Sequence, residues 1–250
     1  MTGTFINIAA ILIGGTLGLL FGARIPERLK TTVVAGMGLF TAAMGVQMFL
    51  ISGNQLIVLG ALIVGALLGE WWKIEDGLES LGQALEKRFS RDPFDAAPQQ
   101  NTGTSQGKPE TGSGSKFIRG FMVASLLFCI GPMTILGSIQ DGLTGDYQLL
   151  AVKSTLDGFA SIAFASTLGI GVLFSSLVVL VYQGGISLLA AQLSTFVTDA
   201  MMNEMTATGG VLLLGLAISN LLEIKTIRVG NFLPALVIAP LIVWVLSLVS

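Results

Sequence analysis

The chain has 250 residues, of which 52% are hydrophobic and only 11% are charged, and its mean hydropathy is +0.81. Soluble domains carry about 25% charged residues, so this composition predicts an integral membrane protein that has the lipid bilayer as its surroundings. A net charge of −2 gives no reason to expect a nucleic-acid partner. The chain has no histidine, and its single cysteine, Cys129, can form neither an intramolecular disulfide nor a thiolate cluster. We therefore expect no metal site, no cofactor and no enzymatic activity.

Residues 1–72 are predicted to form the first three membrane helices. Residues 1–23 carry no charge, and because no positive charge precedes the apolar stretch, they predict a retained helix rather than a secretory signal. A short basic connector, residues 24–30, follows. Residues 31–69 are again uncharged, and the turn-forming triplet at 52–54 predicts that they fold into a hairpin of two helices.

The chain changes character over residues 73–116. Trp71 and Trp72 are typical of an anchor at the membrane interface. The apolar residues beyond them recur every three or four positions, which predicts an amphipathic helix over 71–89. This helix lies either on the membrane surface or against another subunit, and both alternatives remain open. Residues 98–115 contain no aliphatic or aromatic residue and predict a flexible linker.

Residues 117–250 are predicted to hold five further crossings, which makes eight in a single all-α polytopic membrane domain. Asp141 and Asp146 fall in a predicted loop over 138–148, and Asp199, Asn203 and Glu204 fall in another. The predicted helices four to eight cover 119–137, 149–168, 172–191, 205–222 and 229–248.

Glycine and proline predict breaks in or between several of these helices. A Gly-Pro step frees backbone carbonyl groups and bends a helix, which is tolerated at membrane depth only where protein or water satisfies those groups. The predicted breaks are Gly131-Pro132 in the fourth helix, Gly169 and Gly171 between the fifth and sixth, and Pro234 and Pro240 in the eighth.

The distribution of basic residues predicts the orientation. If the N-terminus is outside, all but Lys153 of the 13 lysines and arginines fall in cytoplasmic connectors. This agrees with the positive-inside rule. We expect both termini outside and residues 73–116 in the cytoplasm.

Lys153, Asp157 and Ser161 form the most informative pattern in the chain. They lie at i, i+4 and i+8 of the fifth predicted helix, so they share one face of an otherwise apolar segment. An ionisable side chain in a spanning helix costs about 2.5–3.5 kcal/mol on insertion scales and usually faces a partner or a water-filled cavity. The stripe is therefore the candidate ion or substrate site.

Three asparagines, Asn7, Asn220 and Asn231, could add oxygens to this site at membrane depth. The alternative is structural: Lys153 and Asp157 would lock the helix, and each asparagine would form an interhelical hydrogen bond worth about 0.6–2 kcal/mol.

The two ends of the chain show a faint internal symmetry. Helices 1–3 and 6–8 have glycines at corresponding places, and the third and the eighth each follow an asparagine. An offset of five crossings would make the two copies an inverted repeat, which is typical of secondary transporters. Chance similarity is the alternative, because the chain contains 32 glycines.

Several stretches resemble a known family. GTFINIAAILIGGTLG, IPERLK, GALLGE, LTGD followed by KSTLDGFASIAFASTLG, and NFLPAL are similar to segments of the bacterial YqgA/YdfK family of polytopic inner-membrane proteins. The resemblance implies a location in the bacterial plasma membrane, but the family is a domain of unknown function. Its K-S-x-L-D pattern falls on Lys153, Ser154, Leu156 and Asp157.

Two functions from different classes follow. The first is a secondary transporter or channel for a small ion or solute, centred on Asp157. The second is a non-transporting membrane scaffold or sensor, organised by the amphipathic helix and the linker. A homo-oligomer is plausible in either case, because glycine-rich faces allow helices to approach closely.

Overall fold

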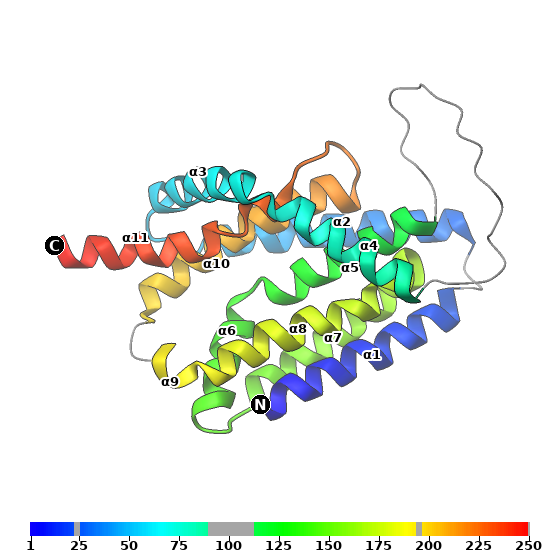
Figure 1. Ribbon diagram of the computed structural model, residues 1–250, viewed down its shortest axis with the longest axis horizontal. Helices are drawn as coiled ribbons and strands as arrows, with labels where there is room; N and C mark the ends of the chain where they lie inside the picture. Colours follow the sequence, from blue (N-terminus) through cyan, green and yellow to red (C-terminus); the bar gives the residue numbers. More distant parts are fainter. Residues whose placement is uncertain (23–25, 90–112, 194–196, 250) are drawn as a thin grey trace.

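The computed structural model describes residues 1–22, 26–89, 113–193 and 197–249, and this part of the chain contains helices but no strand. Figure 1 shows most of the long helices running side by side along the longest axis of the molecule. Seven of them are long and apolar enough to cross a membrane. The all-α membrane fold is therefore as predicted, whereas most of the predicted linker lies outside the described residues.

The first three helices are α1 (Thr2–Gly22), α2 (Glu27–Phe49) and α3 (Gln55–Trp72). α2 begins directly after Pro26, earlier than predicted, because the extended backbone of this proline leads into a first helical turn. Asn54 caps α3, since its side chain accepts a hydrogen bond from the backbone N–H of Leu56 at 3.1 Å.

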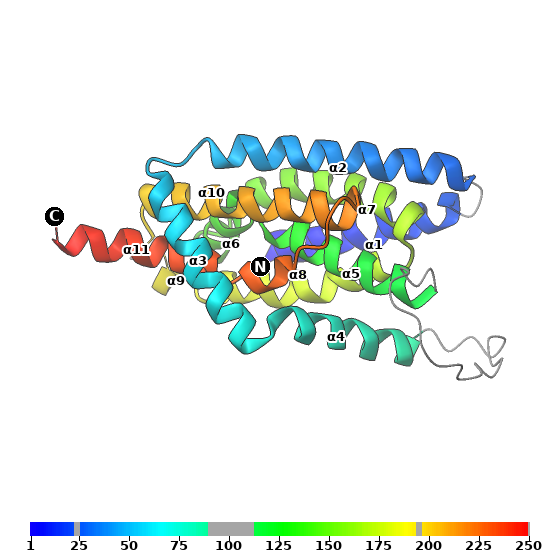
Figure 2. The same ribbon diagram turned by 90° about the horizontal axis from the view of Figure 1, so that it is seen from above.

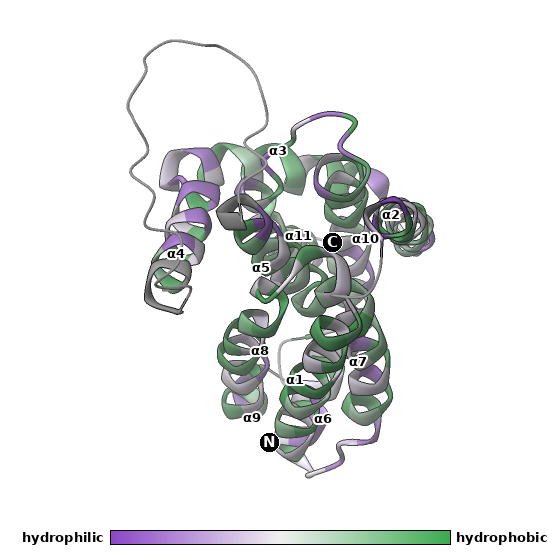
Figure 3. Cartoon of the chain, turned by 90° about the vertical axis from the view of Figure 1, so that its right-hand side faces the viewer, coloured by the Kyte–Doolittle hydropathy of each residue, from purple (hydrophilic) through white to green (hydrophobic). Residues whose placement is uncertain are grey.

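The amphipathic helix is α4 (Ile74–Phe89), which follows Lys73 in a left-handed conformation. Its apolar residues Leu78 and Leu85 pack against Phe117 and Phe121 of the next helix. Figure 3 shows that α4 carries many hydrophilic residues on its remaining surface. A neighbouring helix of the same chain therefore covers part of the apolar face, while Leu81 remains 47% exposed.

The fourth crossing is divided into α5 (Ser113–Cys129) and α6 (Pro132–Leu143), which meet at an angle of 63°. The break lies at the predicted Gly-Pro step. The pair extends along the whole of α8 (Gly171–Leu188), because Phe117 lies against Gly171 and the Ser187 hydroxyl donates to the Ser138 carbonyl at 3.0 Å. Counted as one broken span, this pair brings the candidate crossings to eight.

The fifth crossing is α7 (Gln148–Leu168), and the short α9 (Ala190–Leu193) follows α8. Gly169 has a φ of 84°, a left-handed conformation that favours glycine, so the chain reverses where it was predicted to.

The last part contains α10 (Asp199–Leu216), the π-helical turn η1 (Ala217–Leu221), the 3-10 turn η2 (Val229–Phe232) and α11 (Ala235–Val249). Pro234 separates η2 from α11, as predicted. Pro240 was predicted to interrupt the last helix but lies inside α11 without ending it.

The prediction wrongly placed four polar residues in loops, Asp141, Asp199, Asn203 and Glu204, whereas Asp146 does lie between α6 and α7 as predicted. Asp141 lies in α6 and is 2% exposed, whereas Glu204 lies in α10 and is 4% exposed. Asp199 and Asn203 also belong to α10. Burial of the two carboxylates is possible because each has hydrogen-bond partners from a distant part of the chain, as described below.

The helices form two packed groups, which Figures 1 and 2 show from two directions. In the first group, α1 packs most extensively against α7, and α5, α6 and α8 surround this pair. In the second group, α2 packs against α10 and α3 packs against α11.

Candidate functional site

Lys153 and Asp157 form an ion pair on the inner face of α7 and are only 6% and 8% exposed. The Lys153 ammonium also lies 6.0 Å from the centre of the Phe128 ring at the end of α5, within the range of a cation–π interaction. The polar stripe therefore faces the interior of the bundle, as predicted from the cost of exposing it to lipid.

The position of α1 against this stripe is set by three glycines. Gly14, Gly18 and Gly22 lie against the backbone carbonyl groups of Gly158, Ile162 and Ser166 of α7, so closely that an added Cβ would approach each oxygen to less than 3.0 Å. The spacing is four residues on both helices, so α1 and α7 run parallel. Only glycine allows the two backbones to approach this closely.

This contact brings Asn7 of α1 to the ion pair. The Asn7 side chain is fully buried and lies beside the Asp157 carboxylate. Neither the nitrogen nor the oxygen of its amide completes a hydrogen bond with any described residue. A buried polar group without a partner costs about 1–3 kcal/mol, so a hydrogen bond between this amide and the neighbouring Asp157 carboxyl group would be favourable.

Other unpaired polar atoms lie on the helices around α7. Gln183 of α8 is fully buried, and both ends of its amide lack a partner in the described part of the chain. It neighbours Gly184, which faces Met1 at the start of α1. Hydroxyl groups without a partner belong to Thr4, Ser125, Ser138 and Ser161.

Most of the rest of the interface between α1, α7 and α8 is apolar, since the buried Ser175 and Ser176 hydroxyls of α8 donate to carbonyl groups of their own helix. Ile11, Phe164, Leu168, Val172 and Val179 are at most 3% exposed and belong to one hydrophobic cluster. On α1 and α7 these residues follow the polar ones in the chain, and on α8 they precede Gln183. The polar residues therefore occupy one half of this interface, and the apolar cluster closes the other half.

Asp141 is a second buried carboxylate in this group of helices, which the sequence reading missed. One of its oxygens accepts the Gly3 N–H at 3.0 Å, and the other lies 3.0 Å from the amino group of Met1. A carboxylate at the start of α1 also interacts favourably with the helix dipole. The helical spacing of Thr134, Ser138 and Asp141 is a signal that could have indicated this buried polar face.

Glu204 is buried but fully paired. Its carboxylate accepts hydrogen bonds from the Ser52 hydroxyl at 2.7 Å, the Gly53 N–H at 2.8 Å and the Asn54 N–H at 2.9 Å. It holds the turn between α2 and α3 against α10, which is a structural role.

Asn220 and Asn231 contact other parts of the molecule. The Asn231 side chain accepts the Glu75 N–H at 2.8 Å and donates to Glu70 at 2.5 Å, which ties η2 to the junction of α3 and α4. The backbone carbonyl of Asn220 accepts a hydrogen bond from the Arg119 side chain at 2.6 Å. Of the predicted site residues, the structure therefore brings Asn7 to the ion pair, and Ser161 shares the buried face of α7.

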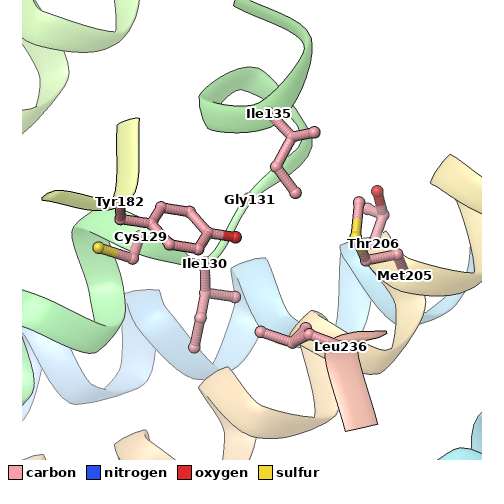
Figure 4. Close-up of a pocket in the computed structure, with 9 residues that line it drawn as sticks. Cys129, Ile130, Gly131, Ile135, Tyr182, Met205, Thr206 and Leu236 are labelled. Atoms are coloured by element: carbon pink, nitrogen blue, oxygen red, sulfur yellow. The ribbon is translucent and has the colours of Figure 1, made fainter. Parts of the chain in front are cut away.

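A cavity of about 10 Å³ lies at the break between α5 and α6, which is at the lower limit of the space that one water molecule needs. It is lined by Cys129, Gly131, Tyr182 and Thr206, among others. Figure 4 shows the Tyr182 ring reaching from α8 towards the backbone of the break. In the described residues, no group of three or more cysteine or acidic side chains could hold a metal ion.

Comparison with known proteins places the chain in a family. A family model described as "Protein of unknown function (DUF554)" matches residues 2–244. The chain belongs to this DUF554 family. The DUF554 match covers α1 to most of α11, so it includes the ion pair and every helix around it, and the predicted resemblance is confirmed.

Two relatives of this DUF554 protein span almost its whole length. The "Uncharacterized protein YqgA" of Escherichia coli (strain K12) is 33% identical over 237 residues, which cover 95% of this chain and 94% of the relative. The "Uncharacterized membrane protein YdfK" of Bacillus subtilis (strain 168) is 30% identical over 250 residues, which cover 98% and 97%. No solved structure matches the chain.

Proposed function

We propose that this DUF554 protein is a secondary transporter or channel for a small ion or solute in the bacterial plasma membrane. Both termini would lie outside, and residues 73–116 would lie in the cytoplasm. The observation that carries the proposal is the buried Lys153–Asp157 pair beside Asn7, an amide with no hydrogen-bond partner in the described structure. Well-packed apolar side chains would stabilise a purely structural bundle as well or better.

The broken fourth crossing supports this proposal. The α5 helix ends beside the ion pair, because Phe128 contacts Lys153. The Thr134 hydroxyl satisfies the Phe128 carbonyl at 3.3 Å, which is one way in which the break is made tolerable. Discontinuous helices at the binding site are a common feature of secondary transporters.

The predicted inverted repeat is also part of the proposal. Each helix of the first copy packs antiparallel against its proposed equivalent: α1 against α8, α2 against α10 and α3 against α11. Gly65 lies against Ala235, for example, and Gly69 lies against Asn231. Such pairing is what a two-fold axis in the membrane plane would produce.

The scaffold alternative has less support. It was organised by the amphipathic helix and the linker, and Leu78 and Leu85 of this helix pack against α5, which leaves less of its apolar face for a partner. Catalysis is not part of the proposal either, because nothing near Asp157 supplies a second converging carboxylate or a nucleophile with an adjacent base.

Three variants test the proposal: Asp157→Asn, Lys153→Met and the double change. Each single change leaves a buried group without its partner and should destabilise the protein by about 3–5 kcal/mol, whereas the double change should restore stability. If Asp157 carries the transported species, the stable double variant should still lack flux.

The measurements are thermal unfolding in detergent and flux into proteoliposomes driven by proton, sodium, potassium or chloride gradients. Thr155→Ala is the matched control, because Thr155 is exposed on the same helix and bonds only within it. Full flux in the stable double variant would rule out a transport role for Asp157.

A further inference from the structure

The Asn7 amide can serve both protonation states of Asp157. An ionised carboxylate accepts hydrogen bonds only, whereas a carboxylic acid also donates one. The Asn7 amide offers an N–H donor to the first form and a carbonyl acceptor to the second. Because neither amide atom has another partner in the described structure, no other hydrogen bond has to break when the amide changes from donor to acceptor.

The packing around the pair disfavours larger occupants. α1 and α7 are in backbone contact at Gly14, Gly18 and Gly22. A groove of about 190 Å³ lies between these two helices, but Asn7, Lys153 and Asp157 are not part of its lining, so it offers the pair no space for a hydrated metal ion or a larger solute. A metal ion would also need several oxygen ligands, but Lys153 already occupies one Asp157 oxygen. A proton needs neither space nor a coordination shell.

The charged groups around Asp157 are also compatible with a proton as the bound species. α1 carries no charged side chain, and the Cys129 thiol of α5 lies near the pair. Asp141 of α6 is paired with Met1. The other titratable side chains that the structure describes on the helices around α7 are Tyr182 on α8, next to Cys129, and Arg28, Lys30, Lys116 and Arg119 near the starts of α2 and α5.

We propose that the species bound at this site is the proton, carried on the Asp157 carboxylate, and that Asn7 is the positioning residue that hydrogen-bonds both of its forms. The inference deepens the proposed transport function and rests on it. A hydronium ion gives its proton to the carboxylate and leaves as water, and release on the other side is the reverse step.

Lys153 has a second favourable contact besides Asp157. The Phe128 ring and the partly negative end of α5 both stabilise its ammonium group. Lys153 is the only one of the thirteen lysines and arginines that lies within α7, so no second basic side chain of this helix competes for the contact with Asp157.

The decisive experiment is infrared difference spectroscopy of the purified protein between high and low pH. We expect a carboxylic acid C=O band at low pH that Asp157→Asn removes. Asn7→Leu should move this band to higher frequency, since the acid loses its acceptor, and Asn7→Ser should restore part of the shift. Asp141→Asn and Glu204→Gln are the matched controls and should leave the band in place.

Proton entry into liposomes that contain a trapped pH-sensitive dye provides the second measurement. Asn7→Leu should slow it about tenfold, as expected for the loss of one hydrogen bond to a charged group, and Asn7→Ser should recover part of the rate. If Asn7→Leu does not fold, the band position and the rate of proton entry are compared between Asn7→Ser and the unsubstituted protein instead.

The outcomes separate the two proposals. A band that persists in Asp157→Asn, or an unchanged band in folded Asn7→Leu, would overturn the proton assignment. Sodium-driven flux with no pH-dependent band would also overturn it while leaving transport intact. An Asp157 band with no flux of any tested ion would sustain the proton site and reject transport.

Discussion

Gly45 of α2 and Gly210 of α10 meet backbone to backbone at the crossing of their helices. A Cβ added to Gly45 would lie 2.6 Å from the Gly210 carbonyl oxygen, and one added to Gly210 would lie 2.5 Å from the Gly45 carbonyl oxygen. The contact is reciprocal, so neither helix can accept a side chain here without moving. Hydrophobic residues alone would hold these helices further apart.

Gly45→Ala should therefore destabilise the protein by about 1–3 kcal/mol, because the added methyl group forces the helices apart. Gly36→Ala on the same helix is the control: nothing lies within 4 Å of its added Cβ. Alanine there should be neutral or stabilising by up to about 1 kcal/mol. Thermal unfolding in one detergent measures both, and equal stabilities of the two variants would contradict the close contact.

Glu204 should matter for stability although it lies far from the ion pair. Glu204→Ala removes three hydrogen bonds to the turn at 52–54 and should cost about 1–3 kcal/mol, and Glu204→Gln should cost less because it keeps an acceptor. Asn203→Ala, at the exposed neighbouring position, should change little. Wild-type stability of Glu204→Ala would show that the turn does not depend on this carboxylate.

Glu75 should make stability depend on pH. Burial raises the pKa of this carboxyl group above its ordinary 4.5, although the Gly230 N–H that it accepts at 2.5 Å partly opposes the shift. A raised pKa in the folded state means that the stabilisation is fully present below 4.5 and is lost as the pH rises through the folded value.

Glu75→Gln keeps an acceptor for Gly230 but cannot ionise. We expect its melting temperature to exceed that of the unsubstituted protein increasingly from about pH 4 to about pH 8. Glu79→Gln, which removes an exposed carboxylate from the same helix, should retain most of the pH dependence. A constant difference across this range would mean that Glu75 does not titrate there.

The proposed orientation predicts which introduced cysteines are accessible from each side. In a Cys129→Ala background, a cysteine at Thr144 should react with a membrane-impermeant reagent added outside intact cells. A cysteine at Ser113 should react only after permeabilisation, because an odd number of crossings separates the two positions. Labelling of both from the same side would refute the eight-crossing topology.

Most of the helices could be predicted from the sequence because their limits depend on local chemistry. Long uncharged segments predict spanning helices. The left-handed backbone at position 169 favours glycine, which is the residue found there. Lys153 and Asp157 could be predicted to face inward for the same kind of reason, since the cost of exposing charges to lipid does not depend on the partner.

Asp141 and Glu204 could not be placed correctly in this way. A carboxylate in a membrane protein is assigned to a loop unless its partners are known, and here the partners lie 138 residues away for Asp141 and about 150 for Glu204. The hydrogen bonds that make their burial tolerable exist only once α6 meets α1 and α10 meets the turn at 52–54.

The sequence by itself determined that this protein is a bundle of membrane helices with one ionisable stripe, because helix length, hydropathy and charge cost are properties of single segments. Only the tertiary structure decided which asparagine serves that stripe. Asn7, Asn220 and Asn231 are alike in sequence, since each lies in or next to an apolar segment. The contact of α1 with α7 through Gly14, Gly18 and Gly22 selects Asn7, because a hydrogen-bonding group acts only where packing brings it within reach.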